Sequence, residues 1–304
     1  MSLGRVRAGV PATTANLGPG FDCLGLSFDL WNEADFELDG AGIQVLVSGE
    51  GAERLPTGPD NLIVQAFLHG LEHRGMPPPA GLRVRVRSAI PTGSGLGSSA
   101  SAVVLGLLGA DWLYGLQLSQ SEVIGLAVEL EGHCDNAAAA LLGGLVVSLR
   151  AGESWLARRF DVPPLRAALV LPALDLPTRE ARKVLPLSIP RADSVFNTSR
   201  AVLVVEALRR GDLDLLGQVM EDRLHQPYRL PLIPGAEQAL RAALRAGASA
   251  AAISGAGPSL IAFCAGESQP IAAAMQAAFA QAGLSSRAFA LTSTSRGAWV
   301  KTGD

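Results

Sequence analysis

The feature that most constrains this chain is a glycine-rich loop between a strand pattern and a helix pattern. Apolar and charged residues alternate over 82–90, which predicts a half-buried strand because neighbouring strand side chains point to opposite faces. Pro91 ends that strand, and residues 98–114 are apolar on nearly every side, which predicts a buried helix. The loop Thr92–Gly97 therefore connects the two elements directly.

Glycines at such a junction suit an anionic ligand. Gly93, Gly95 and Gly97 let the backbone approach a ligand closely, and the start of a helix adds free N–H groups and partial positive charge. The loop lacks the lysine of a Walker A sequence, and Ser98 stands where a Rossmann motif has its third glycine. On these residues alone, a phosphate site and a simple tight turn are both open.

The composition describes a globular protein that must hold an anion through local groups. Hydrophobic residues make up 48% and charged residues 17% of the 304 residues, enough to form a large buried core. The net charge of −3 argues against broad binding to nucleic acid or to acidic membranes. We therefore expect neither nucleic acid nor a membrane among its partners.

Cysteine usage and the N-terminal residues predict the compartment. Cys23, Cys134 and Cys264 are scattered and odd in number, which suits a reducing environment and argues against a disulfide framework. Residues 1–9 contain no apolar core of a signal peptide, and the longest apolar stretches are too short to span a membrane. We expect a cytoplasmic protein.

Strand and helix patterns alternate along the chain, which predicts a mixed α+β fold in both halves. After the loop, Ser119–Glu122 fits a capping box that opens a helix reaching about Glu131. A stretch of mixed character at 151–164 is the predicted boundary, giving domains at 1–155 and 156–304. In the second half we expect strands at 165–172, 250–253, 260–264 and 287–291, and helices at 194–209, 213–222, 235–246 and 270–282.

Three segments, in the same order along the chain, resemble the GHMP kinases, a family named for galactokinase, homoserine kinase, mevalonate kinase and phosphomevalonate kinase. They are Val10–Asp22, Pro91–Ala100 and Ser254–Ser259. The resemblance spans most of the chain and implies an ATP-dependent small-molecule kinase. It also implies an N-terminal domain like ribosomal protein S5 domain 2, a C-terminal ferredoxin-like α/β sandwich, and ATP in the cleft between them.

The resemblance assigns the ATP phosphates to the glycine-rich loop and the start of the following helix. This segment consists of Pro91, Thr92, Gly93, Ser94, Gly95, Leu96, Gly97, Ser98, Ser99, Ala100 and Ser101. It implies that Asn61 contacts the adenine, with an ordinary turn residue as the alternative. It also implies that Ser98 and Glu131 contact Mg²⁺, which completes its shell with water and phosphate oxygens. For Glu131 the alternative is an ordinary carboxylate at a helix end.

Within the family, the chain looks most like the homoserine kinases. Mevalonate kinases carry a lysine just after the first proline of the N-terminal segment, where this chain has Ala12, Thr13 and Thr14. The stretches 131–136 and 222–229 are also similar to homoserine kinases. The resemblance therefore implies that L-homoserine is the small-molecule substrate and O-phospho-L-homoserine, on the route to threonine, the product.

Homoserine presents a carboxylate, an ammonium and a hydroxyl. Arginine grips a carboxylate through two charge-assisted bonds, and the resemblance gives that task to Arg182 and Arg229. The other implied substrate contacts are Asn16, Asp22, His133, Asp135 and Asn136, of which His133 has a structural hydrogen bond as its alternative role. We expect Asp22 and Asn136 to be catalytic by orienting the hydroxyl, because phosphoryl transfer demands little activation of the nucleophile.

Two other functions stay open at this point. One is a different GHMP kinase that phosphorylates another small alcohol. The other is a ligand sensor without catalysis, since this fold also serves as a sugar-responsive partner in regulators; the intact loop with Asp22 and Glu131 argues against it. The sequence leaves the oligomeric state open, a homodimer included.

Overall fold

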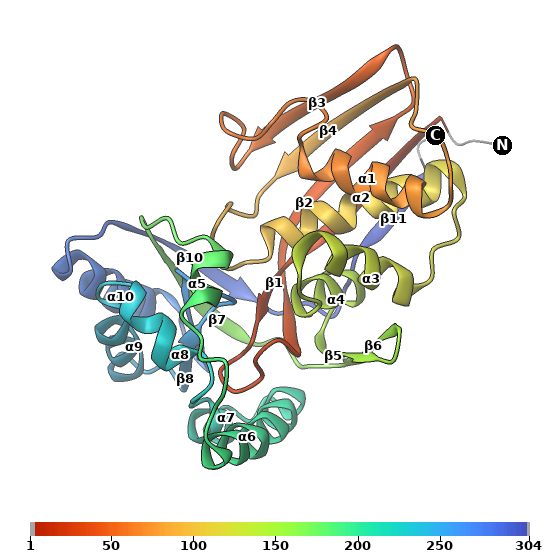
Figure 1. Cartoon of the computed structure of the whole chain (residues 1–304). Helices are drawn as coiled ribbons and strands as arrows, with labels where there is room; N and C mark the ends of the chain where they lie inside the picture. Colours follow the sequence, from red (N-terminus) through yellow and green to blue (C-terminus); the bar gives the residue numbers. More distant parts are fainter. Residues whose placement is uncertain (1–3, 303–304) are drawn as a thin grey trace.

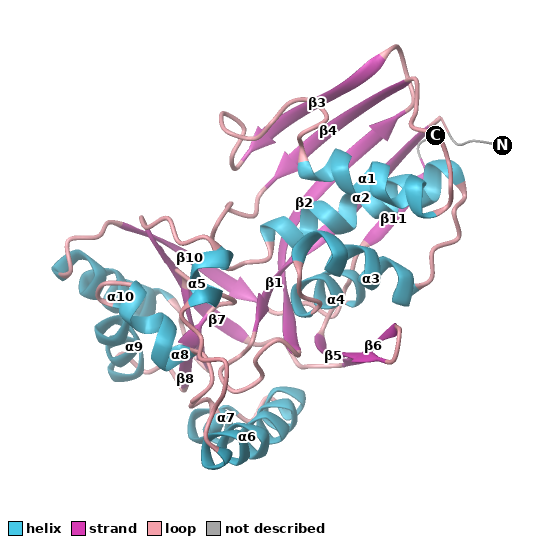
Figure 2. Cartoon of the chain, viewed as in Figure 1, coloured by secondary structure: helices cyan, strands magenta, loops and turns pink. Residues whose placement is uncertain are grey.

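The computed structural model describes residues 4–302, which form two β-sheets with helices packed against them (Figures 1 and 2). The first sheet has seven strands and the second has four. In Figure 1 the two sheets lie side by side, and strand β1 runs from the first sheet toward the second. The mixed α+β fold is as predicted.

The first sheet is built mainly from the first half of the chain. Its strands are β1 (Arg5–Ala15), β2 (Leu24–Glu37), β3 (Gly42–Gly49), β4 (Gly81–Ser88), β5 (Leu145–Ala151), β6 (Ser154–Phe160) and β11 (Trp299–Thr302). The order is β11-β1-β2-β4-β3, while β5 pairs with the start of β2 and with β6. Only β3 and β4 are parallel among these pairs within residues 4–302.

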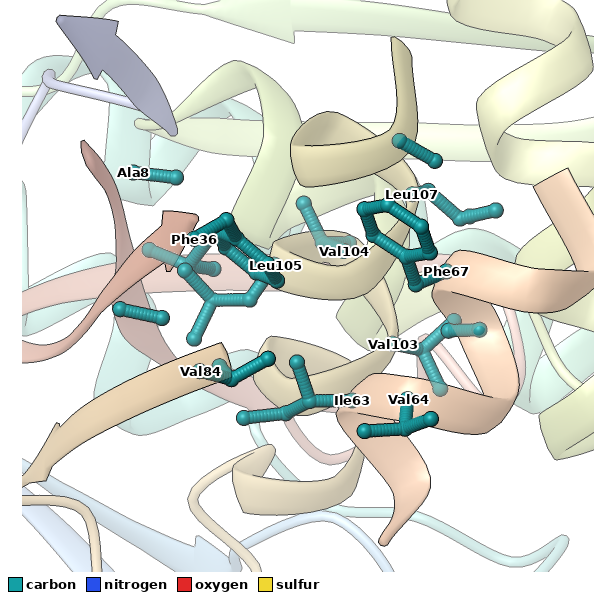
Figure 3. Packing of buried hydrophobic residues seen from close by; sticks show 14 of the residues in the cluster. Ala8, Phe36, Ile63, Val64, Phe67, Val84, Val103, Val104, Leu105 and Leu107 are labelled. Carbon is teal, nitrogen blue, oxygen red and sulfur yellow. The ribbon is translucent and has the colours of Figure 1, made fainter. Parts of the chain in front are cut away.

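Four helices cover one face of the first sheet (Figure 1). They are α1 (Leu62–His73), α2 (Ser98–Tyr114), α3 (Gln120–Glu131) and α4 (Asp135–Leu142). Figure 3 shows Val84 of the sheet beside Ile63 of α1, in the same buried cluster as Phe36, Phe67 and Val104. Because α2 is buried on most sides, its sequence is apolar all round, and its predicted bounds, 98–114, are those observed.

The second sheet has a ferredoxin-like arrangement. Its strands are β7 (Arg166–Pro172), β8 (Ala250–Ile253), β9 (Leu260–Cys264) and β10 (Ser286–Thr292). Neighbouring strands are antiparallel, in the order β10-β7-β9-β8. Counted along the chain, these are the fourth, first, third and second strands of this sheet. Helices separate β7 from β8 and β9 from β10, as the β-α-β-β-α-β pattern requires.

Both faces of the second sheet are covered. On one face lie α9 (Ala236–Arg245) and α10 (Gln269–Gln281), and on the other α6 (Arg191–Arg210) and α7 (Leu213–Val219). The long connection from β7 to β8 also contains α5 (Thr178–Lys183), α8 (Gln226–Arg229) and a 3₁₀ turn, Leu230–Leu232. These short helices carry Arg182 and Arg229, and Arg182 bonds to Asp22 in the loop after β1.

The two sheets share a hydrophobic core. Leu17 and Phe28 from the first half are buried in the same cluster as Leu169 and Phe263 from the second sheet. The change from one sheet to the other falls between β6 and β7, after Phe160, and β11 then returns to pair with β1. The division of the chain into domains at residues 155 and 156 stays a prediction.

The elements predicted for the second half are observed within a few residues of their expected bounds. The largest differences are at helix ends, where α6 begins at Arg191 and α7 ends at Val219. Ser119 makes the predicted capping box with Glu122 at the start of α3. The three cysteines are free thiols. Within residues 4–302, no helix combines the length and apolar character needed to cross a bilayer.

Candidate active site

A cleft of ≈ 230 Å³ lies where the glycine-rich loop, the start of α4 and the second sheet meet. Most of the predicted site residues line it: Asn16, Asp22, Gly93, Ser94, Gly95, Gly97, Ser98, Ser99, Ala100, Glu131, His133, Asp135, Asn136, Arg182 and Arg229. Residues 175–178, before α5, and residues 255–257, in the turn between β8 and β9, complete the wall.

The glycine-rich loop ends at the N-terminus of α2, as predicted. Gly93, Gly95 and Gly97 all have positive φ, and Gly97 is the helix N-cap without any side-chain cap. A Cβ on Gly95 would lie 2.3 Å from the Ser254 carbonyl oxygen, so only glycine fits there. Because the first N–H groups of a helix have no partner within it, this uncapped start is suited to an anion.

Three predicted loop residues are buried behind the cleft surface instead of lining it. Pro91, Leu96 and Ser101 are all buried. The Ser94 hydroxyl donates to the Pro91 carbonyl at 2.6 Å and accepts from the Leu96 N–H at 3.3 Å. The Ser101 hydroxyl donates to the Ser98 carbonyl at 2.8 Å. These groups fix the shape of the loop from within.

A second cavity of ≈ 240 Å³ adjoins the first and shares Gly93, Ser98 and Ser99 with it. Its wall is mainly apolar and comes from β3, β4, α1 and α2 together with Thr92 and Asn61. The Asn61 amide donates to the Pro56 carbonyl at 2.7 Å and accepts from the Ile63 N–H at 3.0 Å, which makes it the N-cap of α1. Sequence reasoning missed the apolar wall, since its side chains read as ordinary core.

The loop after β1 has a strained backbone. Asn16, Leu17 and Asp22 have φ values of 69°, 47° and 57°, a region that residues other than glycine rarely occupy. The Asn16 amide accepts from the Asp22 N–H at 2.9 Å and donates to the Gly255 carbonyl at 2.7 Å. Asn16 therefore ties this loop to the turn of the second sheet and holds Asp22 at the cleft.

Asp22 makes a two-pronged ion pair with Arg182 across the cleft. The guanidinium nitrogens lie 2.9 and 2.6 Å from the two carboxylate oxygens. These hydrogen bonds to Asp22 raise the pKa of Arg182, and burial opposes them. The grip predicted for a substrate carboxylate is here applied to a carboxylate of the protein itself.

Arg229 is a buried cation whose hydrogen-bond partners are all uncharged. Arg229 is 1% exposed. Its guanidinium donates to the carbonyls of Ala181 and Gly255 at 3.1 and 3.3 Å and to the His225 ring at 3.3 Å. Burial, with the charge of Arg182 nearby, lowers the pKa of Arg229 to about 10. The guanidinium is still charged at neutral pH and lines the cleft, and no carboxylate among residues 4–302 is hydrogen-bonded to it.

The start of α4 presents a second carboxylate. Asp135 is buried, lies 2.9 Å from the His133 ring nitrogen Nδ1 and accepts from the Asn136 N–H at 2.7 Å. Burial opposes ionisation of both partners, yet their mutual hydrogen bond raises the pKa of His133 and lowers that of Asp135. The Asn136 side-chain oxygen accepts from the Thr13 hydroxyl at 2.8 Å, a contact that sequence reasoning missed.

The residues predicted to hold Mg²⁺ lie at the edge of the cleft. Glu131 accepts a hydrogen bond from the Ser99 hydroxyl, while the Ser98 hydroxyl is 3.5 Å from the Ile90 carbonyl. Among residues 4–302, no three His, Cys, Asp or Glu side chains gather as a metal cluster. A carboxylate and hydroxyls nonetheless fit an ion that takes its other ligands from phosphate and water.

Comparison with known proteins gives the family. The model for the N-terminal domain of GHMP kinases matches residues 61–144, and that for the C-terminal part matches residues 204–281. The chain is 44% identical to the homoserine kinase of Moorella thermoacetica, over 96% of this chain and 98% of that protein. The chain belongs to the homoserine kinases of the GHMP kinase family.

Other members agree with this assignment. A Synechococcus homoserine kinase is 43% identical over 93% of this GHMP kinase and 92% of its own length. The crystal structure of homoserine kinase from Cytophaga hutchinsonii has a TM-score of 0.85 and 31% identity, covering 98% of both chains. A mevalonate kinase from L. major, 20% identical with a TM-score of 0.67, shares the fold. The predicted family, GHMP fold and ATP-dependent kinase class are thereby confirmed.

We expect His133→Gln to reduce stability most at acidic pH. The pKa of His133 is higher in the folded than in the unfolded protein, where it is about 6.5. Protonation of His133 therefore stabilises the fold fully below the unfolded-state pKa, and this contribution is lost as the pH rises through the folded-state pKa. Urea unfolding of both proteins at about pH 5.5 and about pH 9 measures the difference in free energy. An equal difference at the two pH values would contradict a charged His133–Asp135 pair.

Proposed function

We propose that this chain transfers the γ-phosphoryl group of ATP to the hydroxyl of L-homoserine. The observation that carries the proposal is Arg229, a buried cation with uncharged partners, facing the same cleft as the uncapped start of α2. The Arg229 guanidinium suits a carboxylate, and the start of α2 suits phosphates. The relatives named as homoserine kinases support the same substrate.

The Arg182–Asp22 pair explains why a zwitterionic substrate suits this cleft. A neutral alcohol that separated Arg182 from Asp22 would leave both charges without partners, which costs free energy in a partly buried site. An amino acid brings a carboxylate for Arg182 and Arg229 and an ammonium for Asp22 and Asp135. It can therefore replace both halves of the pair, and a mevalonate-like substrate without an ammonium cannot.

The reaction needs the homoserine hydroxyl near the γ-phosphorus. The hydroxyl oxygen bonds to that phosphorus, the bond to the bridging oxygen of ADP breaks, and the hydroxyl proton passes to the phosphate product or to water. We assign the orientation of the hydroxyl to Asn136 and Asp22. The Thr13 hydroxyl holds the Asn136 oxygen, so the amide is fixed before substrate arrives. Positioning of this kind supplies much of the acceleration, so no obligatory base is proposed.

We assign ATP to the two adjoining cavities. The phosphates would lie against Gly93–Ala100 and the start of α2, and the base in the apolar second cavity, with Asn61 holding its wall as the cap of α1. Ser98 and Glu131 would hold Mg²⁺, which neutralises charge on the transferred phosphoryl oxygens when bound. A cytoplasmic location and a homodimer remain predictions from sequence and resemblance.

A coupled ADP-release assay tests the substrate. We expect turnover with L-homoserine and little with mevalonate, galactose or shikimate, because those lack the ammonium that Asp22 and Asp135 are proposed to bind. Initial rates over the panel at saturating ATP are the measurement. Turnover of another alcohol in the absence of any with homoserine would contradict the proposal.

Arg182→Lys should raise the KM for homoserine by about tenfold or more and leave the KM for ATP nearly unchanged. A lysine ammonium cannot reproduce a two-pronged grip, and hydrogen bonds to charged groups are worth roughly 1.5–3 kcal/mol each. Arg179→Lys is the matched control, because Arg179 lies on the same helix and its side chain is 84% exposed. A rise in the KM for ATP alone would make Arg182 a phosphate contact.

Glu131→Gln should lower kcat on the order of 10²-fold, the size typical of removing one group that stabilises charge in the transition state. The variant should also need more Mg²⁺ for half-maximal rate. Steady-state rates over a Mg²⁺ titration give both quantities. Glu129→Gln, on the same helix but bonded to His69, is the control. An unchanged titration curve would assign Glu131 a structural role.

A further inference from the structure

His225 is hydrogen-bonded to Arg229, one of the residues that line the cleft. It immediately precedes α8 and is fully buried. Its Nε2 is 2.9 Å from the Gly18 carbonyl oxygen, and its Nδ1 is 3.3 Å from a guanidinium nitrogen of Arg229. The ring stacks on Phe21 with centroids 5.3 Å apart. His225 does not line the cleft itself, so it acts on a ligand only through its neighbours.

These contacts define the protonation of the ring. A guanidinium can only donate and a carbonyl can only accept, so Nδ1 must be the acceptor and Nε2 must carry the proton. Asp222, whose carboxylate lies 3.5 Å from Nε2, favours the same tautomer. Burial lowers the pKa of His225, and the charge of Arg229 adds to this while Asp222 opposes it. The ring is therefore neutral, with one proton on Nε2.

A neutral acceptor has a specific advantage at this position. A carboxylate in place of the ring would hold Arg229 equally well but would cancel its charge, as Asp22 does for Arg182. An imidazole that accepts through Nδ1 fixes the guanidinium and leaves its net charge for an anion in the cleft. The same ring donates to Gly18, in the strained loop that carries Asn16 and Asp22.

We infer that His225 is a positioning residue for the reaction, which aims Arg229 at the substrate carboxylate through Nδ1 and anchors the 16–22 loop through Nε2. The inference rests on the proposed function, because the carboxylate in question is that of homoserine. It extends that function by adding a residue outside the cleft, on which recognition of an α-amino acid depends. Within residues 4–302, the other hydrogen-bond partners of Arg229 are two main-chain carbonyls, so His225 is the side chain among its hydrogen-bond partners.

Two variants separate the ring's two contacts. The amide oxygen of His225→Asn can take the place of Nδ1, so this variant keeps an acceptor for Arg229 and loses the bond to Gly18. The longer amide of His225→Gln reaches the place of Nε2, so it keeps a donor for Gly18 and loses the bond to Arg229. The two substitutions remove the same ring and introduce the same functional group, which makes each the control of the other.

Steady-state kinetics should distinguish them. We expect His225→Gln to raise the KM for homoserine by about tenfold, as loss of a hydrogen bond to a charged group implies, with the KM for ATP unchanged. His225→Asn should stay several-fold closer to wild type. A wild-type KM for homoserine in His225→Gln, or an equal rise in the KM for ATP, would overturn the inference and leave His225 a core residue.

A long-range ¹H–¹⁵N correlation spectrum of the wild-type imidazole provides a test that needs neither substrate nor a variant. We expect a neutral ring with its proton on Nε2 at neutral pH. A proton on Nδ1 would leave no acceptor for Arg229 and would overturn the inference. If wild type fails to phosphorylate homoserine while the spectrum shows the Nε2–H tautomer, the proposed substrate is wrong and the support of Arg229 by His225 stands.

Discussion

The geometry of the site depends on the contact between the glycine-rich loop and the turn that joins β8 to β9. The buried Ser254 hydroxyl donates to the Gly95 carbonyl at 2.7 Å and lies 2.8 Å from the Thr14 hydroxyl. The Gly255 N–H adds a bond to the Ala15 carbonyl. These contacts join the first sheet to the second at the point where the cleft forms. The loop that is suited to phosphates therefore takes its shape from residues in both halves of the chain.

Local pattern predicted much of the fold and the loop, because both depend on residues close in sequence. Helix α2 and its glycine-rich approach are defined by neighbours, and so is the capping box of Ser119. The bonds that build the rest of the site join residues far apart: Asp22 to Arg182, Thr13 to Asn136, and Gly18 to His225. A periodic pattern in the sequence does not indicate pairs that are so far apart. Only the resemblance to a family predicted that the two arginines and the carboxylates belong to one site.

The two arginines show how one cleft can be both stable when empty and receptive to an anion. Arg182 is compensated by Asp22 and has a raised pKa, whereas Arg229 is buried among uncharged partners and has a lowered one. The centroid of the Phe21 ring lies 5.7 Å from the guanidinium carbon of Arg182 and 5.2 Å from that of Arg229, so both cations face this ring. Desolvation of Arg229 costs stability, and a bound carboxylate would restore part of it. Ligand binding and folding free energy are thus linked at this residue.

The pairing of β11 with β1 affects the order in which the first sheet forms during protein synthesis. Residues Trp299–Thr302 pair with β1 near the start of the chain, after the whole second sheet has been formed in sequence. At ~5–20 residues per second, a ribosome would need roughly 15–60 s between emergence of the two strands. During that time one edge of β1 has its backbone N–H and C=O groups unpaired, and such an edge invites pairing with other chains. Completion of the first sheet is therefore a late event in biosynthesis, and protection of β1 by a chaperone would matter most before the last strand is translated.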